Sequence, residues 1–247
     1  MKKLTLALAA AAILTALPAV SYADDMFSFN VGAVSDYRYR GISQTRLKPA
    51  LQGGFDAALP GGFYVGTWLS TIKWIKDFGG NADVEWDIYG GYKTEISKDL
   101  TLDVGVLRYQ YPSHDLPIAP NTTEIYGALT FGPVTAKYSH SVSNLFGFDD
   151  SKNSGYLDLS GSFDVGGGFM VNPHLGYQRV AHNGDFSYTD YSIGVSKEVV
   201  KGLVVSLAAV GADTKSIGGT KAYASPANGK DMGKAGVVAG IKYSYSF

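Results

Sequence analysis

Hydrophobic and polar side chains alternate along most of this chain with a period of two residues. The stretch SDYRYRGISQT at 35–45 is a sharp short example, because charges occupy even positions and aromatic rings occupy odd ones. A two-residue period is that of a β-strand, whose successive side chains point to opposite faces. Read back to Phe27, the alternation predicts a strand over 27–40 with one apolar face that ends in tyrosines and one polar face that ends in charges.

The same pattern predicts twelve strands, joined by short and long connections in turn. Most short connections contain glycine or proline, which favour chain reversal. The alternation of short and long connections is typical of an up-and-down antiparallel β-barrel in an outer membrane, with short periplasmic turns and longer extracellular loops. The predicted strands are 27–40, 50–59, 63–70, 82–95, 100–111, 122–131, 134–140, 155–163, 169–179, 187–197, 203–212 and 234–247.

The charged face of each strand is expected to line an aqueous lumen. A lysine or arginine that faces lipid near the midplane costs about 2–4 kcal/mol, and an acidic residue costs less. Arg108, Arg179 and Lys197 fall on the lipid side of this register, but they lie near strand ends, where their side chains can extend to the interface. The candidates for lumen or constriction residues are Asp36, Arg38, Arg40, Asp83, Glu85, Asp87, Lys93 and Glu124.

The last predicted strand ends the chain on an aromatic residue. Its apolar face includes Tyr243, Tyr245 and Phe247. It is similar to the C-terminal signal strand of outer-membrane barrels, which implies the barrel-assembly machinery and periplasmic chaperones as partners. Amphipathic rings suit the headgroup level of a membrane. The candidates for such an aromatic girdle are Tyr37, Tyr39, Trp86, Tyr92, Tyr138, Tyr177, Tyr191, Tyr243 and Tyr245.

The N-terminal residues predict export. Lys2 and Lys3 precede an apolar run over 4–20, and small residues follow at the positions that a signal peptidase needs. We therefore expect a signal peptide over 1–23, cleaved after Ala23, and a barrel over 24–247 in the outer membrane of a Gram-negative bacterium.

Composition narrows the function classes. With 21 basic and 22 acidic residues the chain has no basic excess for nucleic acid, and without cysteine it has no disulfides or thiolate chemistry. The four histidines are scattered without metal-site spacing, so we expect no metal and no cofactor. A serine hydrolase needs Ser and His within hydrogen-bonding distance. Ser139 and Ser141 flank His140 but point to the opposite face, so an enzyme is not expected and an outer-membrane hydrolase is the weakest alternative.

Three motifs carry a family resemblance. SDYRYRGISQT at 35–45, GFYVGTW at 62–68 and VEWDIYGGY at 84–92 resemble the TorF porin family of proteobacterial outer-membrane proteins, and they cover the first third of the expected mature chain. The first string is unusual, whereas the glycine-aromatic motifs recur in many barrels. The resemblance implies a barrel and a diffusion role, with no established substrate and no catalytic residues.

Two functions follow from the lumen. On this register it contains more acidic than basic residues, which favours passive diffusion of small hydrophilic solutes or ions through a mildly acidic channel. Alternatively, Arg38 and Arg40 pair with Asp83, Glu85 and Asp87 and fill a narrow barrel, which then has a structural or surface-interaction role through its loops, chiefly 213–233. Twelve strands lie between the filled eight-stranded barrel and the open sixteen-stranded pore, so the strand count does not decide between them.

Overall fold

The computed structural model describes residues 26–247. The expected signal peptide over 1–23 and its cleavage after Ala23 lie outside the described residues. Within the described part of the chain, none of the helices has the length and apolar character needed to cross a membrane.

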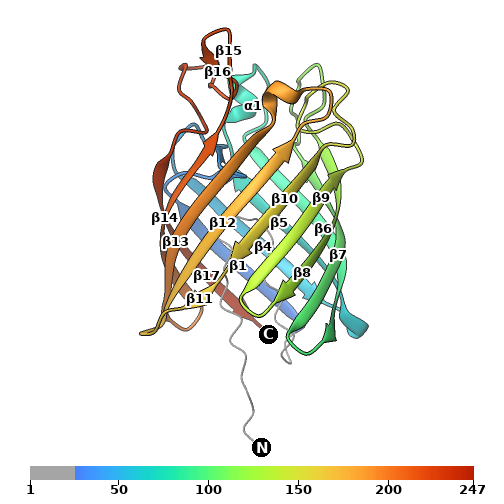
Figure 1. The fold of residues 1–247 in the computed structure, drawn as a ribbon, viewed down its shortest axis with the longest axis vertical. Coiled ribbons are helices and arrows are strands. Elements are labelled where there is room, and N and C mark those ends of the chain that lie inside the picture. The colour runs from blue at the N-terminus through green and yellow to red at the C-terminus, as the bar shows by residue number, and fades with distance from the viewer. Residues whose placement is uncertain (1–25) are drawn as a thin grey trace, which may run out of the picture.

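Twelve antiparallel strands close into one barrel (Figure 1). Strands that follow one another in the ring are hydrogen-bonded, and the pairing of the first strand with the last completes it. The short strand β11 (Phe163–Asp164) follows β10 after a break at Ser162 and pairs with β12. The barrel strands are β1 (Phe27–Val34), β4 (Ala50–Ala58), β5 (Phe63–Thr71), β6 (Val84–Ser97), β7 (Leu100–Gln110), β8 (Thr122–Phe131), β9 (Val134–Ser141), β10 (Gly155–Gly161), β12 (Phe169–Arg179), β13 (Tyr188–Val200), β14 (Leu203–Asp213) and β17 (Gly236–Ser246).

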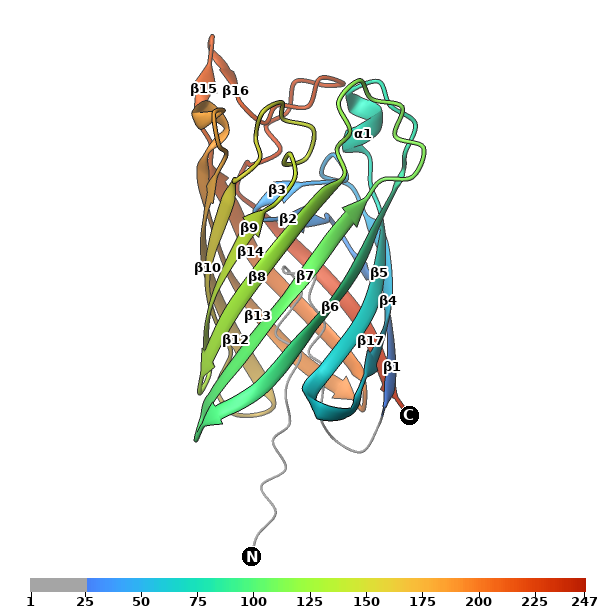
Figure 2. The ribbon, with the colours of Figure 1, turned by 90° about the vertical axis from the view of Figure 1, so that its right-hand side faces the viewer.

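The connections differ at the two ends of the barrel. Figure 2 shows the long loops gathered at one end, here called the long-loop end, and the C-terminus at the other, here called the short-turn end. A turn at the short-turn end includes η1 (Pro60–Gly62). The long loops contain β2 (Arg38–Tyr39), β3 (Ile42–Ser43), α1 (Trp74–Asp77), η2 (Gly184–Phe186), β15 (Ser216–Ile217) and β16 (Thr220–Lys221).

The predicted fold is confirmed, with one substantial difference in the strands. Most boundaries agree within three residues, because an apolar face and a polar face alternate along each strand and fix its register. The first strand is the exception: the prediction of a strand over 27–40 was wrong, since β1 ends at Val34. The chain then leaves the barrel wall, and this departure places Asp36, Arg38 and Arg40 inside the barrel.

The register of the barrel sorts apolar side chains outward and polar ones inward. On β13, Tyr191, Ile193 and Val195 are exposed on the outer wall, whereas Asp190 and Ser192 are buried inside. Six of the predicted girdle residues are likewise exposed, namely Trp86, Tyr138, Tyr177, Tyr191, Tyr243 and Tyr245. An apolar outer wall of this kind is suited to a lipid bilayer.

Two outward basic residues have local partners that reduce their cost. Arg108 donates hydrogen bonds from Nη1 to Thr123 and from Nε to Gln110, at 2.9 Å and 3.2 Å. The Nζ atom of Lys197 lies 4.3 Å from the ring centre of Phe169. Both side chains thus have partners at a strand end.

A pair of neighbouring positions on β14 tests this orientation. Leu207 points outward and is 56% exposed, whereas Ser206 points inward among the small residues Ser196 and Gly240. We expect Leu207→Arg to destabilise the folded barrel by about 2–4 kcal/mol, because the charge faces lipid near mid-strand. Ser206→Arg should cost much less, because its charge faces the lumen. Urea titration of refolding into lipid vesicles measures both; equal costs for the two variants would contradict the assigned faces.

Candidate functional site: the lumen and its inward segment

Residues 35–48, here called the inward segment, fold into the mouth of the barrel at the long-loop end (Figure 2). Strands β2 and β3 pair as a tight hairpin, with Arg38 opposite Ser43 and Tyr39 opposite Ile42. Arg40 and Gly41 form its turn with φ angles of 46° and 76°. Gly41 has no room for a side chain, since a Cβ there would approach the side chain of Asp190 and the carbonyl of Gly211. The hairpin therefore lies directly against the inner face of the wall.

Arg40 makes the strongest contacts between the inward segment and the barrel wall. Its guanidinium donates two hydrogen bonds to the carboxylate of Glu124, at 3.0 Å and 2.7 Å, and a third to Oε1 of Gln178 at 2.7 Å. Its Cζ atom lies 4.1 Å from the ring centre of Tyr156. The side chains of Arg40 and Glu124 are only 6% and 2% exposed. This is a buried bidentate pair, in which the loss of either charge is costly.

The neighbouring charges hold the segment in its own shape and tie it to other loops. Arg38 pairs with Asp36 at 2.5 Å and donates to the carbonyl oxygens of Gly41 and Met232. The hydroxyl of Ser43 donates to Asp36, and its backbone N–H donates to the carbonyl of Met232. The segment is thus connected to the loop between β14 and β17 as well as to the wall.

Tyr37 and Tyr39 lie inside the barrel, so their prediction as girdle residues was wrong. The Tyr37 hydroxyl donates to Oε1 of Glu85 at 2.7 Å, and its ring packs edge-on against Trp68. The Tyr39 hydroxyl shares a hydrogen bond with that of Tyr109 at 2.5 Å. Because the backbone turns inward after Val34, both faces of this segment meet protein.

Six of the eight candidate lumen residues meet in one layer, here called the upper layer. Asp36, Arg38, Arg40, Glu85, Asp87 and Glu124 are all less than 9% exposed there. Glu85 accepts hydrogen bonds from Tyr37 and Tyr111, at 2.7 Å and 2.9 Å. Asp87 is fully buried, and neither of its carboxylate oxygens has a hydrogen-bond partner among the described residues.

The other two candidates lie elsewhere. Asp83 precedes β6 in a loop and pairs at 2.9 Å with Lys76 of α1; this hydrogen bond lowers the pKa of Asp83 from its ordinary value. Its side chain is 55% exposed, so Asp83 is not part of the upper layer. Lys93 is half-buried on the inner face, nearer the short-turn end, where it is register partner to Asp103 of β7.

A second polar cluster lies next to Arg40 on strands β10, β12 and β13. His174 lies between two aspartates, with Nδ1 at 3.1 Å from Asp158 and Nε2 at 2.8 Å from Asp190. Tyr156 donates to Asp190 at 2.9 Å, and the same ring lies under Arg40. In the sequence, His174 is only one of four scattered histidines. The alternation along β12 is enough to assign His174 to the lumen. It does not identify the partners of His174, because the two aspartates lie on the neighbouring strands β10 and β13.

Tyrosines line the lumen by lying over glycines. Tyr64, Tyr89 and Tyr126 point inward, and a side chain added at the neighbouring glycine of an adjacent strand would collide with each ring. Pairing an aromatic ring with a cross-strand glycine is a known way to stabilise curved sheets. The hydroxyls of Tyr64 and Tyr89 donate to Asp103 and Asp56, both at 2.6 Å.

Burial changes along the lumen axis. The upper layer is closed to solvent, whereas inward residues nearer the short-turn end, such as Asn30, Asp103 and Lys242, are half-buried. The inward segment therefore closes the lumen at the long-loop end in this conformation. Below it, the wall is charged and partly open to water.

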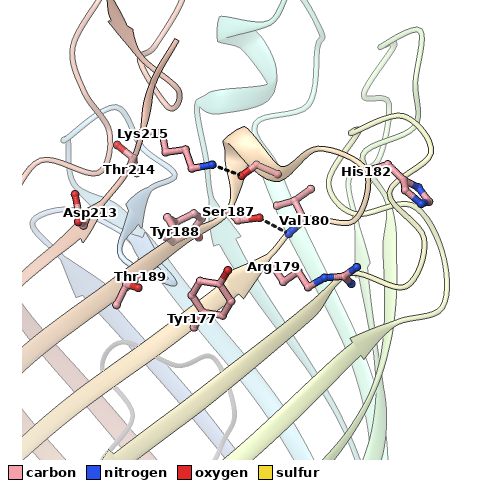
Figure 3. Close-up of a pocket in the computed structure, with 11 residues that line it drawn as sticks. Tyr177, Arg179, Val180, His182, Ser187, Tyr188, Thr189, Asp213, Thr214 and Lys215 are labelled. Atoms are coloured by element: carbon pink, nitrogen blue, oxygen red, sulfur yellow. Dashed lines mark hydrogen bonds between the residues drawn. The ribbon is translucent and has the colours of Figure 1, made fainter.

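A separate pocket of about 550 Å³ lies on the rim, at the long-loop ends of β12, β13 and β14 (Figure 3). Tyr177, Thr189 and Asp213 contribute from the outer face of the wall, where they are cross-strand partners. Arg179 donates to the carbonyl of Asn153, and Lys215 donates to that of Gly184. The pocket is at the outer rim, so it is not part of the lumen.

The structure gives the surroundings of His140 and of the possible metal ligands. His140 contacts Tyr138 and Asn153, at 3.4 Å and 3.3 Å. Over residues 26–247, no three His, Asp or Glu side chains are grouped so that they could hold a metal ion.

A family model described as "Bacterial protein of unknown function (Gcw_chp)" matches residues 19–245. The chain belongs to this family. No curated protein matches the sequence of this Gcw_chp protein. None of the matches indicates an enzyme family.

Solved porin structures share the fold of this Gcw_chp protein. A KdgM porin matches with a TM-score of 0.57 at 8% identity, over 89% of this chain and 99% of that one. A KdgM porin in complex with disordered oligogalacturonate matches with a TM-score of 0.55 at 7% identity, over 90% and 98% of the two chains. A NanC porin matches with a TM-score of 0.54 at 9% identity, over 90% and 100%. At these identities the likeness establishes the barrel fold and leaves the solute open.

Proposed function

We propose that this protein is an outer-membrane channel for passive diffusion of small hydrophilic solutes or ions, with a preference for cations. The observation that carries the proposal is the lumen itself: an interior with polar and charged side chains, enclosed by an apolar outer wall, in a barrel with the fold of porins. A mild excess of acid in this lumen is part of the proposal. Acidic rings in a narrow lumen concentrate cations and repel anions. The TorF resemblance of the sequence supports the same role.

In this proposal the upper layer is the constriction. Asp36, Arg38, Arg40, Glu85, Asp87 and Glu124 surround the point at which the inward segment meets the wall. Opposite charges at such a point orient polar solutes and limit their size. Because the layer is closed in this conformation, conduction requires movement of the inward segment, and we expect brief, low-conductance openings.

The solute is expected to differ from that of one structural neighbour. One of the KdgM structures contains oligogalacturonate, a polymer with a carboxylate on each sugar. Asp56, Asp103 and Asp158 face the lumen of the present protein below the constriction. Lys93, Lys137 and Lys242 also face this part of the lumen, but the aspartates interrupt any continuous basic surface for a polyanion. We therefore propose cations and small neutral solutes instead.

Single-channel recording tests the channel. Refolded protein spanning residues 24–247 is placed in a planar bilayer, and current is measured across a gradient of KCl. We expect discrete steps and a reversal potential that indicates cation preference. Anion preference would refute the acidic-lumen argument, and a folded, heat-modifiable but silent barrel would refute diffusion as the function.

The second candidate function is a closed barrel that acts through its loops. It is supported by the complete burial of the upper layer and by the loop between β14 and β17, whose β15–β16 hairpin projects beyond the barrel (Figure 2). A silent barrel in the recording above would favour this alternative.

Location and assembly are part of the proposal. Export by a signal peptide, insertion by the barrel-assembly machinery and escort by periplasmic chaperones would bring the chain to the outer membrane. Tyr243, Tyr245 and Phe247 are the proposed assembly signal. In the folded barrel, Phe247 exchanges backbone hydrogen bonds with Phe27 and its ring lies near that of Tyr245, so the same residues also join the two ends of the barrel sheet.

A further inference from the structure

The charges of the upper layer do not balance. Asp36 is paired with Arg38, and Glu124 is paired with Arg40. Within residues 26–247 Glu85 has no basic partner, but two tyrosine hydroxyls donate to its carboxylate. Asp87 alone has neither kind of partner among the described residues.

The surroundings of Asp87 make this imbalance costly. The side chain is 0% exposed, and the charged groups that act on it, Glu85 and Glu124, are both acidic. A carboxyl group in such a place is either protonated or, if it is ionised, paired with a positive charge. The lumen below the upper layer is partly open to water, so cations from the solution can supply that charge.

The chemistry around Asp87 favours a monovalent cation. A single uncompensated carboxylate matches one positive charge, and the described residues offer no three-carboxylate group for a divalent metal ion. The inward neighbours of Asp87 in the register are Trp68 on β5 and Tyr109 on β7. Aromatic faces attract weakly hydrated cations, whereas Mg²⁺ gives up its water reluctantly.

We propose that Asp87 holds a monovalent inorganic cation of the size of K⁺ between the inward segment and the barrel wall. The ion compensates the one carboxylate of the upper layer that has neither a basic partner nor a tyrosine hydrogen bond among the described residues, and so stabilises the docked position of the segment. The site does not depend on whether the channel conducts, because it concerns the closed conformation.

The test measures how tightly the inward segment is docked. Chymotrypsin cleaves after tyrosine, and Tyr37 and Tyr39 are protected while the segment is docked. Folded protein (residues 24–247) in detergent at pH 8 is digested while KCl replaces N-methyl-D-glucamine chloride at constant ionic strength. We expect cleavage at these tyrosines to slow in proportion to 1 + [K⁺]/Kd, or about eleven-fold at ten times Kd.

Variants separate this site from general salt effects. Asp87→Asn should be cleaved slowly at every K⁺ concentration, because its neutral amide needs no ion. Asp103→Asn, which alters another lumen carboxylate, should keep the K⁺ dependence of the wild type. If wild-type cleavage is too slow to follow, the K⁺ dependence of the melting temperature gives the same comparison, with Asp87→Ser as a second variant.

Three outcomes would overturn the proposal. In the first, the cleavage rate and the melting temperature of the wild type do not change with K⁺ concentration. In the second, Asp87→Asn keeps the K⁺ dependence of the wild type. In the third, protection increases on acidification but not with K⁺. The last would mean that Asp87 carries a proton instead of a cation. Loss of conduction in the bilayer experiment would leave this result untouched, so the two proposals fail separately.

Discussion

Replacing Arg40 by alanine is expected to release the inward segment while the barrel remains folded. The change removes the bidentate pair with Glu124, the hydrogen bond to Gln178 and the contact with the ring of Tyr156. Removing one partner of a buried ion pair costs about 3–5 kcal/mol, mostly because the other charge is left unpaired. That cost applies to the docked position of the segment, since the hydrogen bonds of the barrel strands do not involve Arg40.

Chymotrypsin digestion followed by mass spectrometry measures the release. We expect cleavage after Tyr37 and Tyr39 in folded Arg40→Ala protein and protection in the wild type, together with more frequent channel openings. Lys48→Ala is the matched control, because Lys48 belongs to the same segment but its side chain is exposed. Substitutions of such surface residues change stability by about 0.5 kcal/mol or less, so protection should persist. Equal protection in Arg40→Ala would show that Arg40 does not hold the segment.

A double variant identifies the cause. Adding Glu124→Ala to Arg40→Ala removes the stranded carboxylate, so part of the lost stability should return. The segment should nevertheless remain less protected than in the wild type, because the contact itself is absent. If the loss of stability in the double variant equals the sum of the losses in the two single variants, the two side chains do not interact directly.

The strands were predictable because each position has only two environments. A side chain in the wall faces either lipid or the lumen, and a one-residue slip would exchange the two faces of the whole strand. This is why the polar positions Glu85, Asp87 and Glu124 were assigned to the interior from parity alone. The twelve segments and the alternation of short and long connections followed from the same pattern.

The inward segment was not predictable from alternation. Asp36 to Arg40 continues the parity of β1 without interruption, although the backbone has left the wall at Val34. Parity gives opposite faces but does not say what either face meets, so Tyr37 and Tyr39 were assigned to lipid. The only local signal was Gly41, whose positive φ allows the turn that reverses the hairpin.

The partners of the charged residues depend on closure of the barrel. Arg40 meets Glu124 and Gln178, which lie far from it in the sequence on β8 and β12. Arg38 and Asp36 pair with each other, whereas the sequence suggested pairs between the arginines and the acids of the strand over 82–95. To predict such contacts one must know which strands lie near one another across the closed barrel. The alternation within a single strand does not give that information.

Removal of the inward segment should produce a wider and more cation-selective channel. Val34 and Ala50 are directly opposite in the β1–β4 pairing, so residues 35–49 can be replaced by Asn-Gly, a favoured two-residue hairpin turn. The barrel ring retains its strand pairs, and Arg38 and Arg40 leave the lumen while Glu85, Asp87 and Glu124 remain on the wall. We expect conductance to increase several-fold and the reversal potential in a KCl gradient to approach that of an ideal cation channel.

A second loop deletion provides the control for this variant. Ser216 and Lys221 are register partners in the β15–β16 hairpin, so residues 217–220 between them can also be replaced by Asn-Gly. This hairpin projects away from the barrel mouth, and its loss should leave conductance unchanged. If removing the inward segment also leaves conductance unchanged in a folded barrel, the narrowest point must lie below the upper layer. The tyrosine-lined wall around Asp56 and Asp103 would then set the limit, since its rings already occupy the inner face over the glycines that accommodate them.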